Sequence, residues 1–367
     1  MNDDAVPLDP TIRLSPDEIR RIAEGSLQDQ FLALQHASHV RWTTEYRLLR
    51  RLGSGGQGIV FLAERLGAHG LTLRVALKFF SPAEFPDAES YRSEMARIAR
   101  VAMRLASVQQ DHLLDVQNIV EVDGIQVMVM EWVDGFDLRK LLDNSRFETL
   151  RTRTAAARWE YINDVIATAG PQQVRLKPGI AVAILRDCLA ALDAMYSHGI
   201  LHGDIKPANI MIKRTGITKL VDFGSSFDPR EKPRRPAWTP LYAPLELMEG
   251  GQYTQRSELA SLGYVLIEML AGAPIFERNG TLDAIREAKR TLPRRMRSLL
   301  PPEVRRNGLL MEMIQRLTDP EPQRRFPSAQ DAELTEAGAA AFHRQLVLSD
   351  LASEYRHEIR HWLELLS

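Results

Sequence analysis

The sequence predicts an α+β protein in two parts, a strand-rich first part followed by a mainly helical second part. Between Tyr46 and Trp132, β-rich segments alternate with turns and enclose a single helical pattern. From Gly135 onward, most apolar residues recur at helical spacing instead. With 367 residues, the chain is also long enough to bury more than one hydrophobic core.

The composition is that of an ordinary globular protein, with 44% hydrophobic and 26% charged residues. The formal net charge of −1 provides no bulk field that would attract nucleic acid or an anionic membrane, so we expect neither as a partner. A single cysteine, Cys188, excludes an internal disulfide and fits a reducing compartment. The acidic N-terminus lacks the pattern of a signal peptide, and no apolar run reaches membrane-spanning length, so we expect a cytoplasmic location.

Residues 1–45 are expected to form a helical extension. Ser15 is followed by Pro16 and Glu18, which is a typical helix start with serine as the cap and proline in the first turn. Apolar residues then follow at helical spacing from Ile19 to Phe31.

Residues 46–134 should contain five strands and one helix. Glycines separate the first two strands, and Asp123-Gly124 marks a tight turn between the last two. The expected strands are Tyr46–Leu52, Ile59–Glu64, Leu71–Phe80, Val116–Val122 and Ile125–Trp132, and the expected helix is Tyr91–Leu105.

Residues 135–335 should be mainly helical. A helix over Ile180–His198 leads towards a short hairpin, and further helices follow from Glu246. The stretch 144–178 is rich in arginine and threonine and is harder to assign to regular structure. The two strands of the expected hairpin are Ile210–Ile212 and Thr218–Val221.

Residues 336–367 should form an amphipathic helical tail. Apolar residues recur at helical spacing from Phe342 to Leu366, with charged residues between them. Packing of the apolar face on the chain's own body is favoured. A homodimer or a docking contact through the terminal helices is the alternative.

A glycine-rich loop precedes a lysine on an apolar strand. Gly53, Gly55 and Gly58 would let backbone amides approach a phosphate closely. An ordinary glycine hairpin fits this pattern too, whereas a dinucleotide-binding fold would place a helix directly afterwards. The β-rich residues after Gly58 favour a lid between two strands. Lys78 lies in the next apolar strand and needs a partner there, because an unpaired buried ammonium is costly.

Two short motifs further along carry most of the chemistry. Residues 202–209 read His-Gly-Asp-Ile-Lys-Pro-Ala-Asn, and residues 222–224 read Asp-Phe-Gly. They supply two metal-ligand candidates, Asn209 and Asp222, a proton acceptor, Asp204, and a phosphate-directed cation, Lys206. Phosphoryl transfer requires this inventory, together with a backbone lid over phosphates and a lysine on a strand.

These elements occur in the chain order of one family. The glycine loop, Val75-Ala76-Leu77-Lys78, the loop at 202–209 and Asp222-Phe223-Gly224 together make the chain resemble the protein kinases, most closely bacterial-type Ser/Thr kinases. The resemblance implies a two-lobed kinase fold over residues 46–335, with a small lobe at 46–134, a large lobe at 135–335 and an insertion near 144–178. Residues 1–45 and 336–367 would be helical extensions.

The resemblance also implies roles in catalysis. Asp204 would orient the acceptor hydroxyl and take its proton, while Lys206 would neutralise charge on the transferring group. Asn209 and Asp222 would hold Mg²⁺, a cation that prefers oxygen ligands. Thr239 would bond Asp204 and Lys206 and so favour serine or threonine as acceptors.

Nucleotide contacts follow from the same resemblance. Lys78 would meet phosphates and a helix carboxylate, with Glu94 as the first choice and Glu89 as the second. Met130, which could equally be plain core, would limit the depth of the adenine pocket, and Asp137 would meet the ribose. The full set implied for ATP is Gly53, Gly55, Gly58, Val60, Ala76, Lys78, Met130, Glu131, Val133 and Asp137.

The end of the activation segment and the central helix also match, with departures. Glu246 should pair with Arg325. Gly203 stands where many protein kinases carry arginine, so a switch based on that arginine and a phosphate is not expected. Leu245 replaces a proline, and Glu258 replaces an aspartate at the start of the central helix.

The resulting expectation is an ATP- and Mg²⁺-dependent enzyme that phosphorylates serine or threonine in protein substrates. His202-Gly203-Asp204 is also typical of aminoglycoside-type small-molecule kinases, which gives the first alternative. A pseudokinase scaffold that binds nucleotide without turnover is the second. Lys206 and the activation-segment match argue against the first, and the complete set of catalytic groups argues against the second.

Overall fold

The computed structural model describes residues 44–231, 238–348 and 355–366. The chain divides into two compact units, the smaller comprising Met1–Arg47 and Arg65–Leu73 and the larger Leu48–Glu64 and Arg74–Ser367. The helix expected in residues 1–45 falls outside the described residues. In the smaller unit, η1 (Ala68–Gly70) is a short turn closed by a 2.8 Å hydrogen bond from Gly67 N to Leu71 O.

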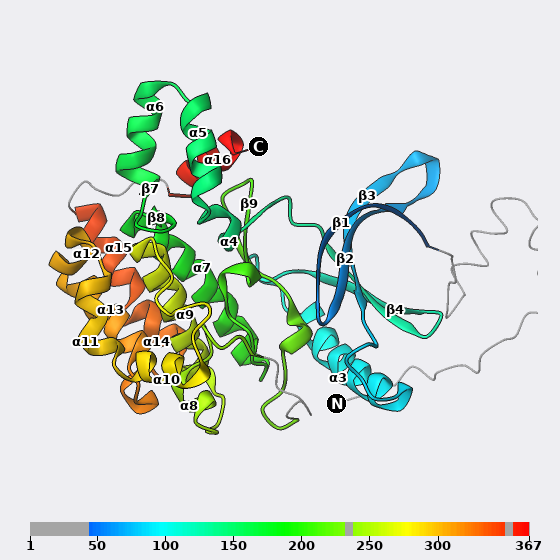
Figure 1. Cartoon of the computed structure of the whole chain (residues 1–367). Coiled ribbons are helices and arrows are strands. Elements are labelled where there is room, and N and C mark those ends of the chain that lie inside the picture. Colours follow the sequence, from blue (N-terminus) through cyan, green and yellow to red (C-terminus); the bar gives the residue numbers. More distant parts are fainter. Residues whose placement is uncertain (1–43, 232–237, 349–354, 367) are drawn as a thin grey trace, which may run out of the picture. The chain divides into compact units, whose positions relative to one another are not determined.

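The expected five strands form one sheet, in the order β1-β2-β3-β5-β4. Strand β5 pairs antiparallel with both β3 and β4, and Ala76 lies opposite Met130 in the β3–β5 register. The sheet and the helix beside it are visible in Figure 1. The strands are β1 (Glu45–Gly55), β2 (Gly58–Leu66), β3 (Thr72–Phe80), β4 (Val116–Val122) and β5 (Ile125–Glu131).

The helix α3 (Ala88–Ala106) covers the position expected from the sequence and extends a few residues further at its start. Asp87 caps it, because the Asp87 carboxylate accepts a 2.7 Å hydrogen bond from Ser90 N. Residues three and four apart, such as Ile98, Val101 and Leu105, are buried and form its inner face.

The mainly helical second part is confirmed from Gly135 onward. Its first elements are β6 (Gly135–Asp137) and α4 (Leu138–Leu141), and the expected hairpin is present as β9 and β10. The remaining elements are α7 (Pro178–Ser197), η3 (Pro207–Asn209), β9 (Ile210–Lys213), β10 (Thr218–Leu220), η4 (Phe223–Ser225), α8 (Leu245–Met248), α9 (Gln255–Ala271), α10 (Leu282–Arg290), α11 (Leu292–Leu299), α12 (Pro302–Arg306), α13 (Gly308–Thr318), η5 (Pro322–Arg324) and α14 (Ala329–Leu334).

The stretch 144–178 is folded into regular structure and joins the core. Ile162, Ile166 and Val174 have no exposed surface, although the arginines and threonines around them give the sequence a polar character. This stretch therefore anchors itself by apolar burial. Its elements are α5 (Asn144–Arg153), α6 (Ala156–Tyr161), η2 (Ile162–Ile166), β7 (Ala167–Ala169) and β8 (Val174–Leu176).

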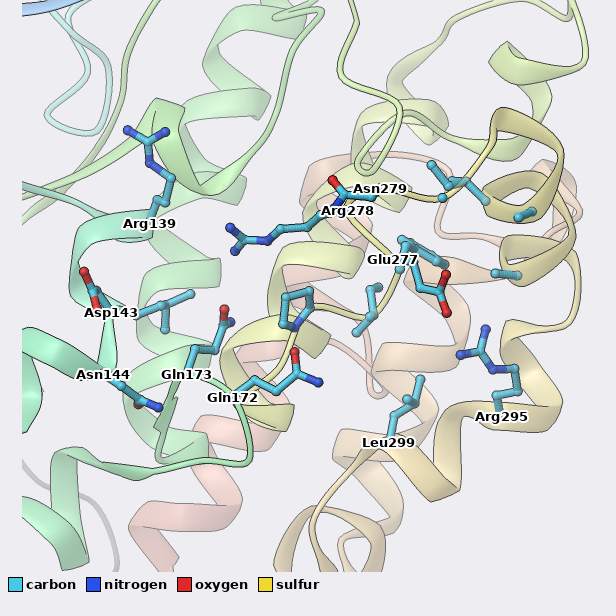
Figure 2. Close-up of a pocket in the computed structure, with 18 of the residues that line it drawn as sticks. Arg139, Asp143, Asn144, Gln172, Gln173, Glu277, Arg278, Asn279, Arg295 and Leu299 are labelled. Atoms are coloured by element: carbon cyan, nitrogen blue, oxygen red, sulfur yellow. The ribbon is translucent and has the colours of Figure 1, made fainter.

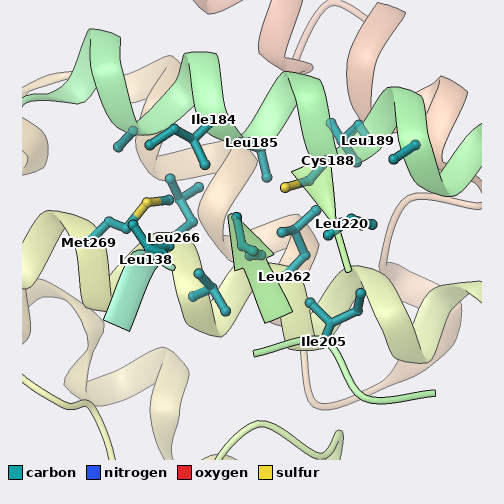
Figure 3. Close-up of a cluster of buried hydrophobic side chains, with 14 of the residues drawn as sticks. Leu138, Ile184, Leu185, Cys188, Leu189, Ile205, Leu220, Leu262, Leu266 and Met269 are labelled. Atoms are coloured by element: carbon teal, nitrogen blue, oxygen red, sulfur yellow. The ribbon is translucent and has the colours of Figure 1, made fainter. Parts of the chain in front are cut away.

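The core of this part lies between α7 and α9 (Figure 3). Leu185 and Leu189 on α7 face Leu262 and Leu266 on α9, and Cys188 lies among them. Burial of Cys188 raises the pKa of its thiol well above the ordinary value. The single cysteine is thus a small core residue, as its helical pattern indicates.

Two tail helices follow, α15 (Ala339–Leu348) and α16 (Tyr355–Leu365). On α16, Ile359, Trp362 and Leu363 are buried, and the helix contacts α7 and η2. Packing on the chain's own body, the favoured expectation for this face, is what the structure shows. Within the described part of the chain, no helix combines the length and apolar character that crossing a bilayer requires.

Candidate active site

Asp204 forms one corner of a small triangle of polar side chains. Lys206 Nζ donates to Asp204 Oδ2 at 2.5 Å, and Thr239 Oγ1 donates to Asp204 Oδ1 at 2.9 Å. Lys206 Nζ also donates to Thr239 Oγ1 at 3.2 Å, which closes the triangle. Asp204, Lys206 and Thr239 are therefore brought together, with one carboxylate held between a cation and a hydroxyl.

The backbone around Asn209 and Asp222 positions two oxygen-bearing side chains. Asn209 ends η3, where its side-chain Nδ2 donates to Asp204 O at 2.8 Å and its backbone carbonyl accepts from Val221 N at 3.0 Å. Asp222 follows β10 in the left-handed region, with φ of 69° and ψ of 76°. This conformation is uncommon for a residue with a side chain and is typical of functional sites.

Asp222 is paired with Lys78. Lys78 Nζ lies 2.5 Å from Asp222 Oδ1, and the lysine is only 6% exposed. Burial by itself would raise the pKa of the Asp222 carboxyl, but the Lys78 ammonium and the Gly224 amide outweigh it and hold the pKa at about 2. Asp222 is therefore ionised at neutral pH, which is the state that binds a divalent cation.

The expected pair between Lys78 and Glu94 is not formed. Glu94 Oε1 instead accepts hydrogen bonds from Arg97, at 2.9 Å from Nε and 2.7 Å from Nη2, and Glu89 is exposed. The reason is that Arg97, one turn along α3, is only 7% exposed and needs a nearby counter-charge. An arginine three residues after Glu94, on the buried face of the helix, was the sequence signal for this competitor.

Gln57, which no sequence motif indicated as a site residue, bridges the two sides of the site. Its Oε1 accepts from Lys78 Nζ at 2.9 Å, and its Nε2 donates to Ser225 Oγ at 2.9 Å. A Cβ at Gly224 would lie 2.1 Å from Gln57 Oε1, so the glutamine side chain lies directly against that glycine. The glycine loop thus contacts the Asp222-Phe223-Gly224 motif through its one long polar side chain.

The three predicted loop glycines have different surroundings. A Cβ at Gly53 or Gly55 would have no neighbour within 4 Å, so nothing in the protein itself requires glycine there. Gly58 has a φ of 141°, and a Cβ would lie 1.9 Å from Phe79 O. The fold demands glycine at Gly58, whereas Gly53 and Gly55 are free to serve a ligand.

The residues assigned to the adenine side lie on β2, on β3 and at the end of β5. Met130 and Val133 are both buried, and Ala76 is paired beside Met130, while Val60 is half-buried on β2.

Glu131 and Asp137 already have protein partners. Glu131 forms ion pairs with Lys219 and Lys213. The Asp137 carboxylate caps α4, accepting from Lys140 N at 3.0 Å and lying 2.7 Å from Lys140 Nζ. A ribose contact would therefore compete with an existing cap.

The backbone conformation at position 203 and the space around it both require glycine. Its φ is 85°, and a Cβ would lie 2.4 Å from Ser225 O. Gly203 N donates to Glu258 Oε1 at 2.7 Å. An arginine at this position, as many protein kinases have, would have both a conformational and a steric cost.

Glu258 is fully buried beneath this loop. Burial raises the pKa of the Glu258 carboxyl to about 7, against the opposing effect of hydrogen bonds from Gly203 N and from tyrosine hydroxyls.

The predicted pair between Glu246 and Arg325 is confirmed. Arg325 Nη1 and Nη2 donate to the two Glu246 oxygens at 2.7 Å and 2.8 Å, in the bidentate arrangement typical of strong pairs. Ser257 Oγ donates to Glu246 Oε1 at 2.7 Å, which ties the pair to the start of α9.

The chemistry of the donor set fits a hard divalent cation. Asp222 contributes an ionised carboxylate, and the Asn209 amide nitrogen is engaged with Asp204, which leaves its oxygen as a ligand. No cluster of three or more His, Cys, Asp or Glu side chains suited to a metal occurs among residues 44–231, 238–348 and 355–366. An ion here would complete its coordination with phosphate and water oxygens, as Mg²⁺ usually does.

Comparisons with known proteins agree with this geometry. A family model described as "Protein kinase domain" matches residues 46–334. The chain is 35% identical over 233 residues to the serine/threonine-protein kinase PknD of Mycobacterium tuberculosis, covering 62% of this chain and 30% of PknD. It is 33% identical over 243 residues to PknH of Mycobacterium bovis, covering 65% of this chain and 35% of PknH.

The fold is also similar to a solved structure, the kinase domain of PknI from Mycobacterium tuberculosis. The TM-score is 0.52 and the identity 26%, covering 84% of this chain and 98% of that domain. The chain spans about a third of the length of the curated relatives it matches.

Proposed function

Because the chain belongs to the protein kinase family, we propose that it transfers the γ-phosphoryl group of ATP to serine or threonine hydroxyls of proteins. The observation that carries the proposal is the triangle of Asp204, Lys206 and Thr239. It presents one carboxylate, one cation and one hydroxyl at the point where an acceptor hydroxyl would have to lose its proton.

Each member of the triangle has a distinct task. Asp204 accepts the proton from the acceptor hydroxyl and orients that hydroxyl through its second oxygen. Lys206 keeps the carboxylate in place and stabilises negative charge on the group in transfer. Thr239 fixes the carboxylate from the other side, which limits the positions open to a bulky acceptor and supports serine or threonine.

Asn209 and Asp222 would hold Mg²⁺, and Lys78 would contact phosphate oxygens of ATP. The bound nucleotide supplies the γ-phosphoryl group, and the ion neutralises charge on the phosphates. Gly53 and Gly55, which have open space around them, would let the loop backbone approach those phosphates. Val60, Ala76, Met130, Glu131 and Val133 would line the adenine side.

Glu94 has a smaller proposed role than the sequence implied. Its carboxylate is engaged by Arg97, and Lys78 already has Asp222 and Gln57 as partners. We place Glu94 as a support of α3 whose contact with Lys78 would require Arg97 to release it.

The two alternatives lack support of this kind. A small-molecule kinase would not need Thr239 and the segment up to Glu246, which are joined to Asp204 and to Arg325 by side-chain hydrogen bonds. A pseudokinase scaffold would not need to keep Asp222 ionised beside Lys78. We also propose a cytoplasmic location, where ATP, Mg²⁺ and protein acceptors are available.

The proposal is tested by labelling with Mg·ATP. The purified chain should label itself or a generic protein acceptor on serine or threonine, and Asp204→Asn should lower the rate by at least about a hundredfold. Asp222→Asn should lower it similarly by weakening the ion site. Asp164→Asn, which removes an exposed carboxylate on η2, is the matched control and should leave the rate unchanged.

Three results would contradict the proposal. They are wild-type turnover in Asp204→Asn, labelling of an aminoglycoside in preference to protein, and nucleotide binding without any transfer.

A further inference from the structure

The large lobe contains a cavity of about 1050 Å³ that the motif chemistry does not use. One wall is the end of α4 and the turn after it, and the other is the loop after α9 together with α10 and α11 (Figure 2). Gln172 and Gln173, from the turn between β7 and β8, lie between these walls. Below, this cavity is called the basic groove.

The stretch 144–178 builds part of this groove and is fixed firmly in place. Backbone N–H groups of Gln172 and Gln173 both donate to Gly272 O, at 3.0 Å and 2.9 Å. A Cβ at Gly170 would lie 2.7 Å from Gly272 Cα, so the turn approaches the end of α9 as closely as a backbone can. The groove is therefore preformed, which lowers the cost of binding a ligand.

A chain of hydrogen bonds connects the groove to the candidate active site. Gln173 Nε2 donates to Glu268 Oε1 at 3.1 Å, and Tyr242 Oη donates to Glu268 Oε2 at 2.7 Å. Tyr242 and Asp204 line the same small hollow, together with Thr239. The groove and the acceptor site are thus linked by three side chains, which places them in neighbouring parts of the large lobe.

The groove carries more positive than negative charge. Four cations line it against two carboxylates. The cations are Arg139, Lys140, Arg278 and Arg295, and the carboxylates are Asp143 and Glu277.

The arginines are largely free to bind a ligand. Arg278 and Arg295 form no ion pair or side-chain hydrogen bond with any residue in the described part of the chain. Arg139 has only a 3.9 Å approach to Asp137, which Lys140 holds at 2.7 Å. Arg278 extends from the loop after α9 towards the wall that carries Arg139 (Figure 2). An arginine presents a fork of donors that matches a carboxylate, so this pair of walls is suited to acidic side chains.

Two of the groove arginines also act on Tyr242, which lines the hollow that contains Asp204. Burial raises the pKa of the Tyr242 hydroxyl, as does the neighbouring Glu268, while Arg278 and Arg139 oppose this rise. Arg278 and Arg139 are thus close enough to Tyr242 to affect its charge state, although burial has the larger effect.

We propose that the basic groove binds an acidic segment of the protein substrate and so selects acceptors that are flanked by aspartate and glutamate. The inference rests on the proposed protein kinase activity and adds the class of substrate. The occupant is a polypeptide carboxylate cluster, because the free donors of the groove are guanidinium groups and because Gln173 in the groove is linked through Glu268 to Tyr242 at the acceptor site.

The test compares serine peptides that differ only in their flanks, acidic, neutral or basic, placed at several distances from the acceptor. Wild-type enzyme should prefer an acidic peptide over its neutral form by at least about tenfold in kcat/KM, mostly through KM. Raising the salt concentration should reduce the preference, because exposed charges are screened. The KM for ATP should not change.

The decisive variants are matched in charge and in location. Arg278→Glu combined with Arg295→Glu should abolish or reverse the preference. Arg294→Glu combined with Arg297→Glu changes the charge equally on α11 but outside the groove, and should retain it. Thermal unfolding and hydrolysis of ATP in the absence of peptide provide controls for folding and for the nucleotide site.

The outcomes separate the two proposals. Equal use of acidic and neutral peptides, a preference for basic ones, or a preference that survives in Arg278→Glu/Arg295→Glu overturns the groove while protein kinase activity stands. Loss of the acidic preference in Arg294→Glu/Arg297→Glu also overturns the proposed role of the groove, since it would show a general charge effect. ATP hydrolysis without transfer to any peptide or protein would instead reject the proposed function itself.

Discussion

The two ion pairs expected from the sequence had different outcomes, and the contrast shows when a predicted contact can be relied upon. Glu246 and Arg325 are paired as expected, whereas Glu94 is bound by Arg97 and not by Lys78. Arg325 has no exposed side-chain surface, and its other hydrogen-bond partners among the described residues are backbone carbonyls, so a single carboxylate can neutralise it. Lys78 has two candidate carboxylate partners in the kinase family, Glu94 and Asp222, and in this structure it is paired with Asp222.

The ion pair of a buried cation can thus be predicted when one carboxylate is available, but not when several are. The choice in the second case depends on which competitor is nearby, and Arg97 is such a competitor.

Removing the partner of Arg325 should give the largest effect on stability. Glu246→Ala leaves a fully buried guanidinium without its carboxylate, which should reduce the free energy of unfolding by about 3–5 kcal/mol. Chemical denaturation measures this loss. Arg324→Ala, at the exposed neighbouring position, should change it by less than about 0.5 kcal/mol. Comparable losses of unfolding free energy in the two variants would mean that the buried ion pair contributes no more to stability than an exposed side chain.

The pH dependence of stability should reveal the buried carboxyl of Glu258. Its pKa is about 7 in the folded protein against 4.5 for a free side chain, so the folded state holds a proton that the unfolded state loses between these values. Stability should therefore fall as pH rises from 4.5 to 7, by about 3 kcal/mol at most from this group.

The neutral isostere Glu258→Gln tests this directly. It cannot titrate but keeps an oxygen that accepts from Gly203 N, so its unfolding free energy should vary less than that of the wild type over the same pH range. Parallel curves for the two proteins would show that folding does not raise the pKa of Glu258.

A methyl group at Gly203 should cost about 1–3 kcal/mol of stability and much of the activity. The cost combines a positive φ with a Cβ placed 2.4 Å from Ser225 O. Gly250→Ala is the matched control, because Gly250 has a similar φ of 80° and open space around it. The excess loss in Gly203→Ala over Gly250→Ala isolates the contact with Ser225. Equal losses would assign everything to the backbone conformation.

The smallest expected effect concerns Glu94 itself. Glu94→Gln should lower the free energy of unfolding by about 1–2 kcal/mol, since it weakens two hydrogen bonds from the buried Arg97. It should reduce phosphotransfer far less than Asp222→Asn does. A loss of activity as large as that of Asp222→Asn, with unchanged stability, would restore Glu94 as the working partner of Lys78.

Much of the candidate site could be predicted because its parts are close in sequence. Asp204, Lys206 and Asn209 lie within one loop, and Asp222 follows one short hairpin later, so local backbone geometry nearly determines their arrangement. The helix α3 was likewise predictable from its apolar spacing, which reflects burial on one face, and β3 and β5 were predictable from their continuous apolar runs, which are buried.

The remainder depends on contacts between distant residues. Gln57 reaches Ser225 across 168 positions, which no pattern within the glycine loop indicates. The stretch 144–178 looked irregular because arginines and threonines surround the few apolar residues, Ile162, Ile166 and Val174, that hold it in the core. The role of Asp137 as the cap of α4 could not be predicted, because an aspartate is equally suited to bind a ribose hydroxyl.

The burial of Cys188 has a practical consequence. A thiol that is sealed between two helices and kept protonated reacts with alkylating reagents only when the surrounding lobe opens. Since the chain has no second thiol, each modified molecule records one opening event at a known place. The rate of Cys188 modification thus measures how often the large lobe opens. A nucleotide or peptide that stabilises the closed lobe should lower this rate.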